Sequence, residues 1–205
     1  MSPRLLPLPK ISPIVPIERP LPFDDPDWLF EPKFDGFRGI LYINQDAATF
    51  YSKRGLVFRR FSRLAADVRD ALGVRNAILD GEVLAIDETG QHNFRSLMSA
   101  AGHLHYAAFD VLWLNGRDFQ SLPLIKRRPL LEQLIGRTTP LLSRTLMVPG
   151  EGRDLFEAVK RLDLEGIICK RAADPYDTKS VWFKVKNKAY SQMTENRFER
   201  FSRKR

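Results

Sequence analysis

Five short segments that combine charged residues with glycines or aromatic residues follow one another along the 205-residue chain. The first is the hexapeptide K-F-D-G-F-R at residues 33–38. The other four, in chain order, are L-D-G-E at 79–82, A-F-D at 108–110, E-G-I-I-C-K at 165–170 and W-F-K-V-K at 182–186. A lysine beside an Asp-Gly pair is common, but five such segments in one order are hard to explain by chance. Their order is therefore the strongest constraint on the fold.

Hydrophobic periodicity predicts strands and helices that do not alternate regularly. The predicted helices are 60–72, 94–101, 125–135 and 153–162. The predicted strands are 37–43, 48–51, 105–114, 166–170 and 181–185, with a strand pair or one bent strand at 77–86 around the Asp80-Gly81 turn. We therefore expect an α+β fold in which antiparallel sheets are flanked by helices.

The composition predicts a globular protein with three parts. A proline-rich, extended arm occupies residues 1–22, a single domain occupies 23–187, and a basic tail occupies 188–205. Hydrophobic residues make up 43% of the chain and aromatic residues 11%, which argues against intrinsic disorder. No apolar run approaches the roughly 18 residues of a membrane span, so we expect no membrane association.

The net charge of +8 favours a polyanionic partner such as nucleic acid, although a basic surface without that role stays open.

Cys169 is the single cysteine, which excludes an internal disulfide and fits a reducing, cytoplasmic compartment. We expect Cys169 to be a buried core residue. His103 and His105 lack further metal-ligand partners, so we expect them to be structural or exposed.

The last segment predicts a face with two cations. Because residues two apart in a strand share a face, Trp182, Lys184 and Lys186 point one way. Phe183 and Val185 then point the other way, towards a core. Two ammonium groups on one face are suited to holding a phosphate.

In order and spacing, the five segments resemble the nucleotidyltransferase domain of ATP-dependent DNA ligases, a superfamily that also contains RNA ligases and mRNA-capping enzymes. The resemblance covers residues 14–187. The stretch F-D-V-L-W-L-N-G at 109–116 is especially similar to the bacterial ligase modules used in end joining, and much less similar to RNA ligases or capping enzymes. The resemblance implies the covalent nucleotidyltransferase fold, which is related to ATP-grasp folds.

The resemblance implies that Lys33 is the nucleophile, which takes AMP from ATP as a phosphoramidate. An ordinary lysine is mostly protonated at neutral pH, so nearby cations and partial burial are expected to free its lone pair. Lys184 and Lys186 are the expected catalytic partners of Lys33. Glu165 is the expected ligand of Mg²⁺, which would offset charge on the triphosphate.

The resemblance also implies six nucleotide-binding residues. These are Glu31 beside the adenine, Arg38 at the phosphate or ribose oxygens, Glu82 as acceptor from the ribose hydroxyls, Phe109 stacked on the purine, and Lys53 and Lys179 near the phosphates. Taken singly, several have simpler explanations: an exposed glutamate for Glu31, a hairpin acid for Glu82 and a core aromatic for Phe109. Lys53 stands where the family has arginine, which puts a bidentate phosphate contact there in doubt.

The expected function is that of an ATP-dependent DNA ligase, which forms a lysyl-AMP and transfers the AMP to the 5′-phosphate of nicked or broken double-stranded DNA during repair. Too few residues precede Lys33 for an NMN-binding domain, so ATP rather than NAD⁺ is the expected donor. Too few follow Lys186 for the OB-fold of such ligases, which leaves room for a separate OB-fold or end-joining partner protein. Two alternatives stay open: a nucleotidyltransferase acting on RNA ends, and a non-catalytic, DNA-binding relic of the fold.

Overall fold

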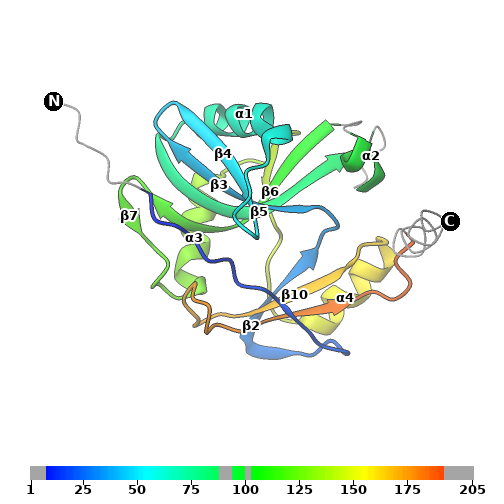
Figure 1. Cartoon of the computed structure of the whole chain (residues 1–205). Coiled ribbons are helices and arrows are strands. Elements are labelled where there is room, and N and C mark those ends of the chain that lie inside the picture. The colour runs from blue at the N-terminus through cyan, green and yellow to red at the C-terminus, as the bar shows by residue number, and fades with distance from the viewer. Residues whose placement is uncertain (1–7, 88–93, 100–102, 192–205) are drawn as a thin grey trace. The chain divides into compact units, whose positions relative to one another are not determined.

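The computed structural model describes residues 8–87, 94–99 and 103–191, and the chain forms two compact units (Figure 1). Unit 1 consists of the segment up to Ile14, Gly36–Thr145 and Ala173–Ser180. Unit 2 consists of Val15–Asp35, Leu146–Ala172 and the segment from Val181 onwards. The expected basic tail lies outside the described residues from position 192, as do residues 1–7 of the arm.

Unit 1 is built on a sheet with the strand order β4-β3-β5-β6-β7, to which β8 is added beside β6. Its strands are β3 (Phe37–Asn44), β4 (Ala47–Ser52), β5 (Asn76–Ile86), β6 (His103–Leu114), β7 (Arg117–Asp118) and β8 (Leu142–Arg144). All neighbours are antiparallel except β6 and β8. The predicted antiparallel sheet is therefore confirmed, with one short parallel addition.

Helices cover the sheet of unit 1 (Figure 1). They are η1 (Arg59–Phe61), α1 (Ser62–Leu72), α2 (Phe94–Ser99) and α3 (Leu124–Leu134). Helix α1 packs against β4 and β6 and buries Leu64 and Val68 in a core with Leu41 and Phe50. All of these helices were predicted to within a few residues; the end of the predicted helix 94–101 lies outside the described residues.

Strand β5 decides between the two alternatives for residues 77–86 in favour of one bent strand, so Asp80 and Gly81 lie inside a continuous strand and not in a turn. Its pairing with β6 shifts register twice, between Ile78 and Leu79 and between Asp80 and Gly81. Such β-bulges bend a strand without ending it. Gly81 is required for close approach, since a Cβ atom there would lie 2.6 Å from the Ala107 carbonyl oxygen.

Unit 2 is built on a second sheet with the order β1-β11-β10-β2-β9. Its elements are β1 (Ile17–Glu18), β2 (Asp25–Lys33), β9 (Val148–Gly150), α4 (Gly152–Arg161), β10 (Gly166–Arg171) and β11 (Trp182–Lys186). The strands are antiparallel except for β1 and β11. Helix α4 packs against β2 and β10 and closes a core that contains Phe30, Val159, Ile167 and Val185.

Two proline-containing segments, the arm and β2, contribute strands to the unit 2 sheet. Strand β2 was not among the predicted strands, and it contains Pro26 and Pro32, which are unusual inside a sheet. Its pairing with β9 involves only Asp25, Leu29 and Phe30, so Pro32 lies where that neighbour requires no N–H donor. Within the arm, the Ile17–Glu18 segment is added to this sheet as an edge strand. None of the helices in the described parts of the chain has the length and apolar character needed to cross a membrane.

Candidate active site

One face of the unit 2 sheet carries a group of charged side chains. On the central strand β10, Gly166 pairs with Lys33 on one side and Lys186 on the other, and Ile168 pairs in the same way with Glu31 and Lys184. Directly opposed residues point to the same face of a sheet. The residues of this "charged face" are therefore Glu31, Lys33, Lys170, Lys184 and Lys186.

The opposite face of the same sheet is apolar, as the strand periodicity of the last segment predicted. Val185 is completely buried, and Phe183 packs against the core beneath α4. Alternation along β11 therefore directs Lys184 and Lys186 away from that core. The structure thus brings together four of the lysines and glutamates expected at the site, all on strands of one sheet.

Glu165 immediately precedes β10 and forms an ion pair with the Nζ atom of Lys33. Both side chains are about four-fifths buried, with 22% and 17% of the Lys33 and Glu165 side chains exposed. Gly166 has a φ of 152°, so strand alternation does not extend back to Glu165. The Asn187 amide donates to the Glu165 carbonyl oxygen at 2.8 Å, which fixes this turn against the end of β11.

Asp35 is a third acidic group near the same lysine. Burial and, to a smaller extent, the Glu165 charge raise the pKa of Asp35 to about 6, although Lys33 and a hydrogen bond from Tyr190 oppose the shift. The Tyr190 hydroxyl lies 3.5 Å from Asp35 Oδ2. Two carboxyl groups thus flank Lys33, and one of them is protonated more readily than an ordinary aspartate.

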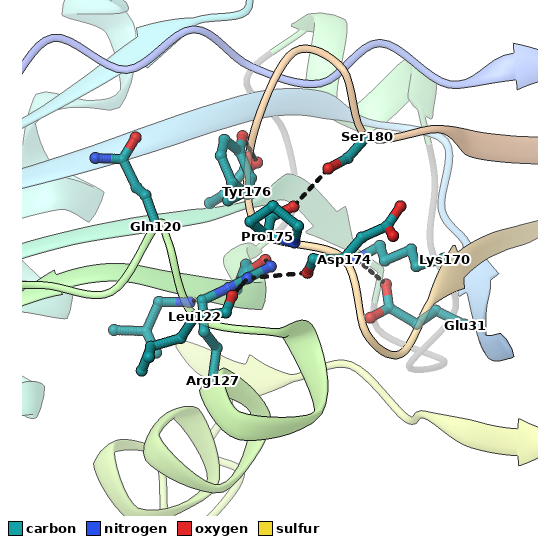
Figure 2. A network of polar contacts seen from close by, with 12 residues as sticks. Glu31, Gln120, Leu122, Arg127, Lys170, Asp174, Pro175, Tyr176 and Ser180 are labelled. Atoms are coloured by element: carbon teal, nitrogen blue, oxygen red, sulfur yellow. Dashed lines mark hydrogen bonds and ion pairs between the residues drawn. The ribbon is translucent and has the colours of Figure 1, made fainter. Parts of the chain in front are cut away.

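Lys170 and Glu31 form a buried ion pair, with Nζ and Oε2 2.7 Å apart and side-chain exposures of 1% and 2% (Figure 2). The Lys170 ammonium also lies 4.2 Å from the centre of the Trp182 ring. Sequence reasoning gave no role to Lys170, although it closes the fourth segment. Its cross-strand position between Leu29 and Trp182 depends on the register, which the sequence alone does not reveal.

In unit 1, Arg38 is held by a buried acid. Its Nε and Nη2 atoms donate to the two oxygens of Asp80 at 3.0 and 2.6 Å, and its Nη1 atom donates to the Ile14 carbonyl oxygen. The Tyr176 hydroxyl donates to Asp80 at 2.5 Å. Burial alone would lower the pKa of Arg38, but the Asp80 carboxylate more than reverses this, so the guanidinium stays charged.

Phe109 occupies an unusual place in β6. Asp80 is opposite Asp110 and Gly81 is opposite Ala108, so Phe109 is the extra residue of a β-bulge. Ala108 and Asp110 are at most 1% exposed, whereas Phe109 is only partly buried. Bulges re-aim a side chain, and the Arg38 guanidinium lies 5.4 Å from the Phe109 ring centre. The expectation that a lone Phe in this strand is simply core is therefore not met.

The other unit 1 residues expected at a nucleotide lie at separate points of that unit. Glu82 is opposite Arg38 in the β3–β5 pair and is partly buried. Lys53 is exposed in the turn after β4, and Lys179 is exposed in the 173–180 segment. The Lys179 amide donates to the Asp177 side chain at 2.7 Å, which shapes that turn.

Polar contacts hold the 173–180 segment within unit 1, and the contact of Arg127 with the Asp174 carbonyl oxygen is among those drawn in Figure 2. The Tyr176 amide donates to the Gln120 carbonyl oxygen at 2.7 Å, and the Leu124 amide donates to that of Asp174 at 2.9 Å. Beneath them, Arg127 donates twice to Asp110 at 2.8 Å, and both side chains are 1% exposed. This anchoring holds Tyr176 against Asp80.

Residues expected to have no chemical role behave accordingly. Cys169 is completely buried in the unit 2 core, and burial raises its pKa to about 12. His103 is exposed, while His105 is buried between the Pro140 carbonyl and Ser143 hydroxyl oxygens at 2.9 and 2.7 Å. Across residues 8–87, 94–99 and 103–191, no group of three or more His, Cys, Asp or Glu side chains is arranged to hold a metal ion.

A family model described as "ATP dependent DNA ligase domain" matches residues 17–186, which is most of the chain. The chain belongs to the ATP-dependent DNA ligase family. The family confirms the resemblance seen in the five segments, and it favours DNA ligases over the RNA-directed alternative. This ligase chain is therefore an adenylation domain by family and by fold.

Two curated relatives are longer than the matched region, and the chain covers only part of the length of each. The multifunctional non-homologous end joining protein LigD of Mycolicibacterium smegmatis is 31% identical over 168 residues, which cover 78% of this chain and 21% of LigD. The SPbeta prophage-derived DNA ligase-like protein LigB of Bacillus subtilis is 30% identical over 183 residues, covering 84% of this chain and 66% of LigB. The chain thus spans about a fifth of the length of LigD.

Solved ligase structures confirm the fold. The mycobacterial DNA ligase D complexed with ATP and MES matches with a TM-score of 0.75 and 26% identity, over 86% of this chain and 60% of that one. The Chlorella virus DNA ligase-adenylate matches with a TM-score of 0.60 and 17% identity, over 86% and 69% of the two chains, and shows the fold alone. The predicted nucleotidyltransferase fold is therefore confirmed, although its two sheets also contain short parallel pairs.

Proposed function

We propose that this chain transfers AMP from ATP to Lys33 and then to the 5′-phosphate of a DNA break. The observation that carries the proposal is the charged face of unit 2. There Lys33 contacts Glu165, and the same face presents Lys184 and Lys186 in a ligase fold. Several lysines on one sheet face repel one another, so this arrangement favours a site that binds an anion over an ordinary surface.

The first step forms a covalent lysyl-AMP. After losing a proton, Lys33 Nζ attacks the α-phosphorus; an N–P bond forms, the bond from the α-phosphorus to its bridging oxygen breaks, and pyrophosphate leaves with that electron pair. Glu165 accepts a hydrogen bond from Nζ and is therefore suited to take the proton. Lys184 and Lys186 supply positive charge for the phosphates.

Mg²⁺ is the metal we propose for this step. Mg²⁺ is usually held by one or two carboxylates together with substrate phosphates and water. Glu165, with Asp35 close enough for their charges to interact, provides a donor set of this kind. Bound there, the ion would offset negative charge on the triphosphate; the residues would hold it without a larger protein cage.

The remaining nucleotide roles are proposals carried over from the resemblance, residue by residue. They assign Glu31 to the adenine, Arg38 to the phosphate or ribose oxygens, Glu82 to the ribose hydroxyls, Phe109 to the purine, and Lys53 and Lys179 to the phosphates. The bulge at Phe109 supports an aromatic role outside the core. The bonds that Arg38 makes to Asp80 support a second role, in which Arg38 also positions Phe109 through their cation–π contact.

Nicked or broken double-stranded DNA is the proposed substrate, in a repair pathway of the bacterial cytosol. The net charge of +8 supports a polyanionic substrate. Relatives named for non-homologous end joining support this assignment, and a separate OB-fold or end-joining protein is the partner we propose. The single, buried Cys169 fits a reducing compartment.

The deciding experiment incubates the chain with ATP labelled at the α-phosphate and Mg²⁺, followed by denaturing electrophoresis and mass spectrometry of the Lys33 peptide. We expect one AMP on Lys33, none in Lys33→Ala, and a normal yield in the control Lys160→Ala. Lys160 is a suitable control because it lies on α4 and pairs with Glu157. Adduct at full yield in Lys33→Ala would overturn the assignment.

The same preparation separates the alternatives. A ligase should transfer AMP to a nicked DNA duplex and seal a pre-adenylated DNA nick, whereas an RNA-end enzyme should prefer nicks with RNA ends. A non-catalytic relic should bind DNA without forming any adduct. NAD⁺ in place of ATP should give no adduct.

A further inference from the structure

Glu18, on the arm, belongs to the charged face although sequence reasoning gave it no role. Strand β1 is the edge of the unit 2 sheet and runs parallel to β11, with Glu18 in register with Lys184. The Arg19 amide donates to the Lys184 carbonyl oxygen at 2.9 Å and secures this register. Since cross-strand partners share a face, the Glu18 carboxylate is on the same side as Lys184 and Lys186.

The Glu18 carboxylate directly contacts one of these lysines. Its Oε2 atom lies 2.8 Å from Lys186 Nζ, and the two side chains are 59% and 36% exposed. The hydrogen bond and charge of Lys186, followed by the charges of Lys184 and Lys188, hold the pKa of Glu18 below its ordinary value. Glu18 therefore carries a negative charge at neutral pH, beside the cations proposed to bind phosphate.

A carboxylate oxygen and a phosphate oxygen make the same kind of bond to an ammonium group. Glu18 and a phosphate thus compete for Lys186. The pair is exposed, and exposed ion pairs contribute little stability, so a triphosphate would displace Glu18 at small cost. The displaced carboxylate would stay on the same strand and repel the incoming phosphate through space.

We infer that Glu18 is an internal competitor for the phosphate-binding lysines, which lowers the affinity of the chain for ATP and for pyrophosphate. The inference rests on the proposed function. A competitor of this kind weakens the binding of nucleotide before reaction and eases the release of pyrophosphate after it. Because it acts on binding and not on the reacting atoms, it should alter the half-saturating ATP concentration more than the maximal rate.

The test compares Glu18→Gln with the wild-type chain. The rate of Lys33–AMP formation is measured against ATP concentration, and the binding of inorganic tripolyphosphate is measured by calorimetry. We expect the half-saturating ATP concentration to fall about two- to fivefold, in the range of exposed ion pairs, and tripolyphosphate to bind tighter by a similar factor. The maximal rate should stay within about twofold, because differential transition-state binding is unchanged.

Glu157→Gln is the matched control. Glu157 is 55% exposed and lies 2.8 Å from Lys160 on α4, which packs against β2 and β10. Its substitution changes the net charge by the same amount and breaks the same kind of pair, so it should alter neither measurement. Glu18→Ala removes the same charge without introducing an amide and should behave like Glu18→Gln, and melting temperatures verify that each variant folds.

Equal or weaker tripolyphosphate binding by both Glu18 variants, with Glu157→Gln unchanged, would overturn the inference. An equal gain in Glu157→Gln would also overturn it, because net charge alone would then explain the effect. Failure of the proposed function has a different signature: no variant, including wild type, would form Lys33–AMP. The tripolyphosphate measurement would still report on Glu18 in that case.

Discussion

The Nζ atom of Lys170 lies 2.7 Å from Oε2 of Glu31, and neither side chain is more than 2% exposed. The pair joins β10 to β2 two residues from Lys33 in sequence, on the face that carries the proposed nucleophile. Removing both charges from water is costly, and only their mutual contact and neighbouring groups offset that cost. Removing either residue would therefore leave the other as a buried charge without this contact.

Lys170→Met should destabilise the chain strongly, since it leaves Glu31 buried without this ammonium. We expect the free energy of unfolding to fall by about 3–5 kcal/mol, measured by urea denaturation. Adding Glu31→Leu should recover part of the loss. Lys160→Met, which breaks an exposed pair, should stay within about 0.5 kcal/mol of wild type. An equal loss of unfolding free energy in Lys170→Met and Lys160→Met would show that burial of the Lys170 charge is unimportant.

Lys184→Ala and Glu165→Ala should fold normally and lose most adenylation. Each removes a charge proposed to act at the triphosphate, and one such electrostatic contact is typically worth about 10²–10³ in rate. The measurement is single-turnover formation of Lys33–AMP, with circular dichroism to verify folding. Lys160→Ala serves again as the control. Rates within a few-fold of wild type would place both residues away from the phosphates.

Asp35 should make stability fall as pH rises through weakly acidic values. Its pKa is about 6 in the folded chain against an ordinary 3.8, so the native state binds more protons than the unfolded state between those values. The free energy of unfolding therefore decreases across that window. Asp35→Asn should remove this contribution and be more stable than wild type above pH 6.

Urea denaturation at several pH values tests this, with the difference between variant and wild type as the readout. Asp154→Asn on α4 is the control, because Asp154 is an exposed carboxylate. A difference between Asp35→Asn and wild type that does not change with pH would contradict the predicted titration.

Gly36→Ala should destabilise unit 1 because the backbone there passes close to β5. A Cβ atom would lie 2.5 Å from the Val83 carbonyl oxygen and 2.7 Å from a methyl group of Leu84. We expect a loss of about 1–3 kcal/mol, as for other overpacked sites. Gly136→Ala is the control, since nothing lies within 4 Å of its added methyl group. Equal melting temperatures for the two variants would refute the predicted clash.

Tyr176→Phe should lower the free energy of unfolding, because it weakens the network in which Asp80 binds Arg38. It deletes the hydroxyl that donates to Asp80 at 2.5 Å, and a hydrogen bond to a charged group is worth about 1.5–3 kcal/mol. Tyr51→Phe on β4 is the control, since its hydroxyl lies outside the Arg38–Asp80–Tyr176 network. Chemical denaturation of both variants distinguishes a specific loss at Asp80 from a general effect of removing a tyrosine hydroxyl.

The parts that sequence predicted are those in which local periodicity decides the outcome. Alternation along β11 was enough to place Lys184 and Lys186 opposite Phe183 and Val185, because a strand has a strict two-residue repeat. The helices were found from their apolar spacing. The requirement for Gly36 comes from its close approach to β5, which local periodicity does not reveal.

The parts that sequence missed depend on register between distant strands. Lys170 meets Glu31 only because β10 pairs with β2 in one register, and a shift of one residue would turn Lys170 into the core. Phe109 leaves the core because of a bulge, and Glu18 joins the charged face because β1 pairs with β11. None of these pairings has a local signal, and the prolines of β2 hide the strand itself.

The sheet that carries Lys33 also sets an order of events during synthesis. In the described part of the chain, strand β2 pairs with β9 and β10, and both are translated after Leu146. Trp28, Leu29 and Phe30 therefore leave the ribosome long before any strand exists to pair with them. Unpaired apolar strands in a nascent chain are prone to wrong association. The proposed nucleophile is thus on the last sheet to be completed, and a chain interrupted before β10 would contain Lys33 without the strands that carry Lys170, Lys184 and Lys186.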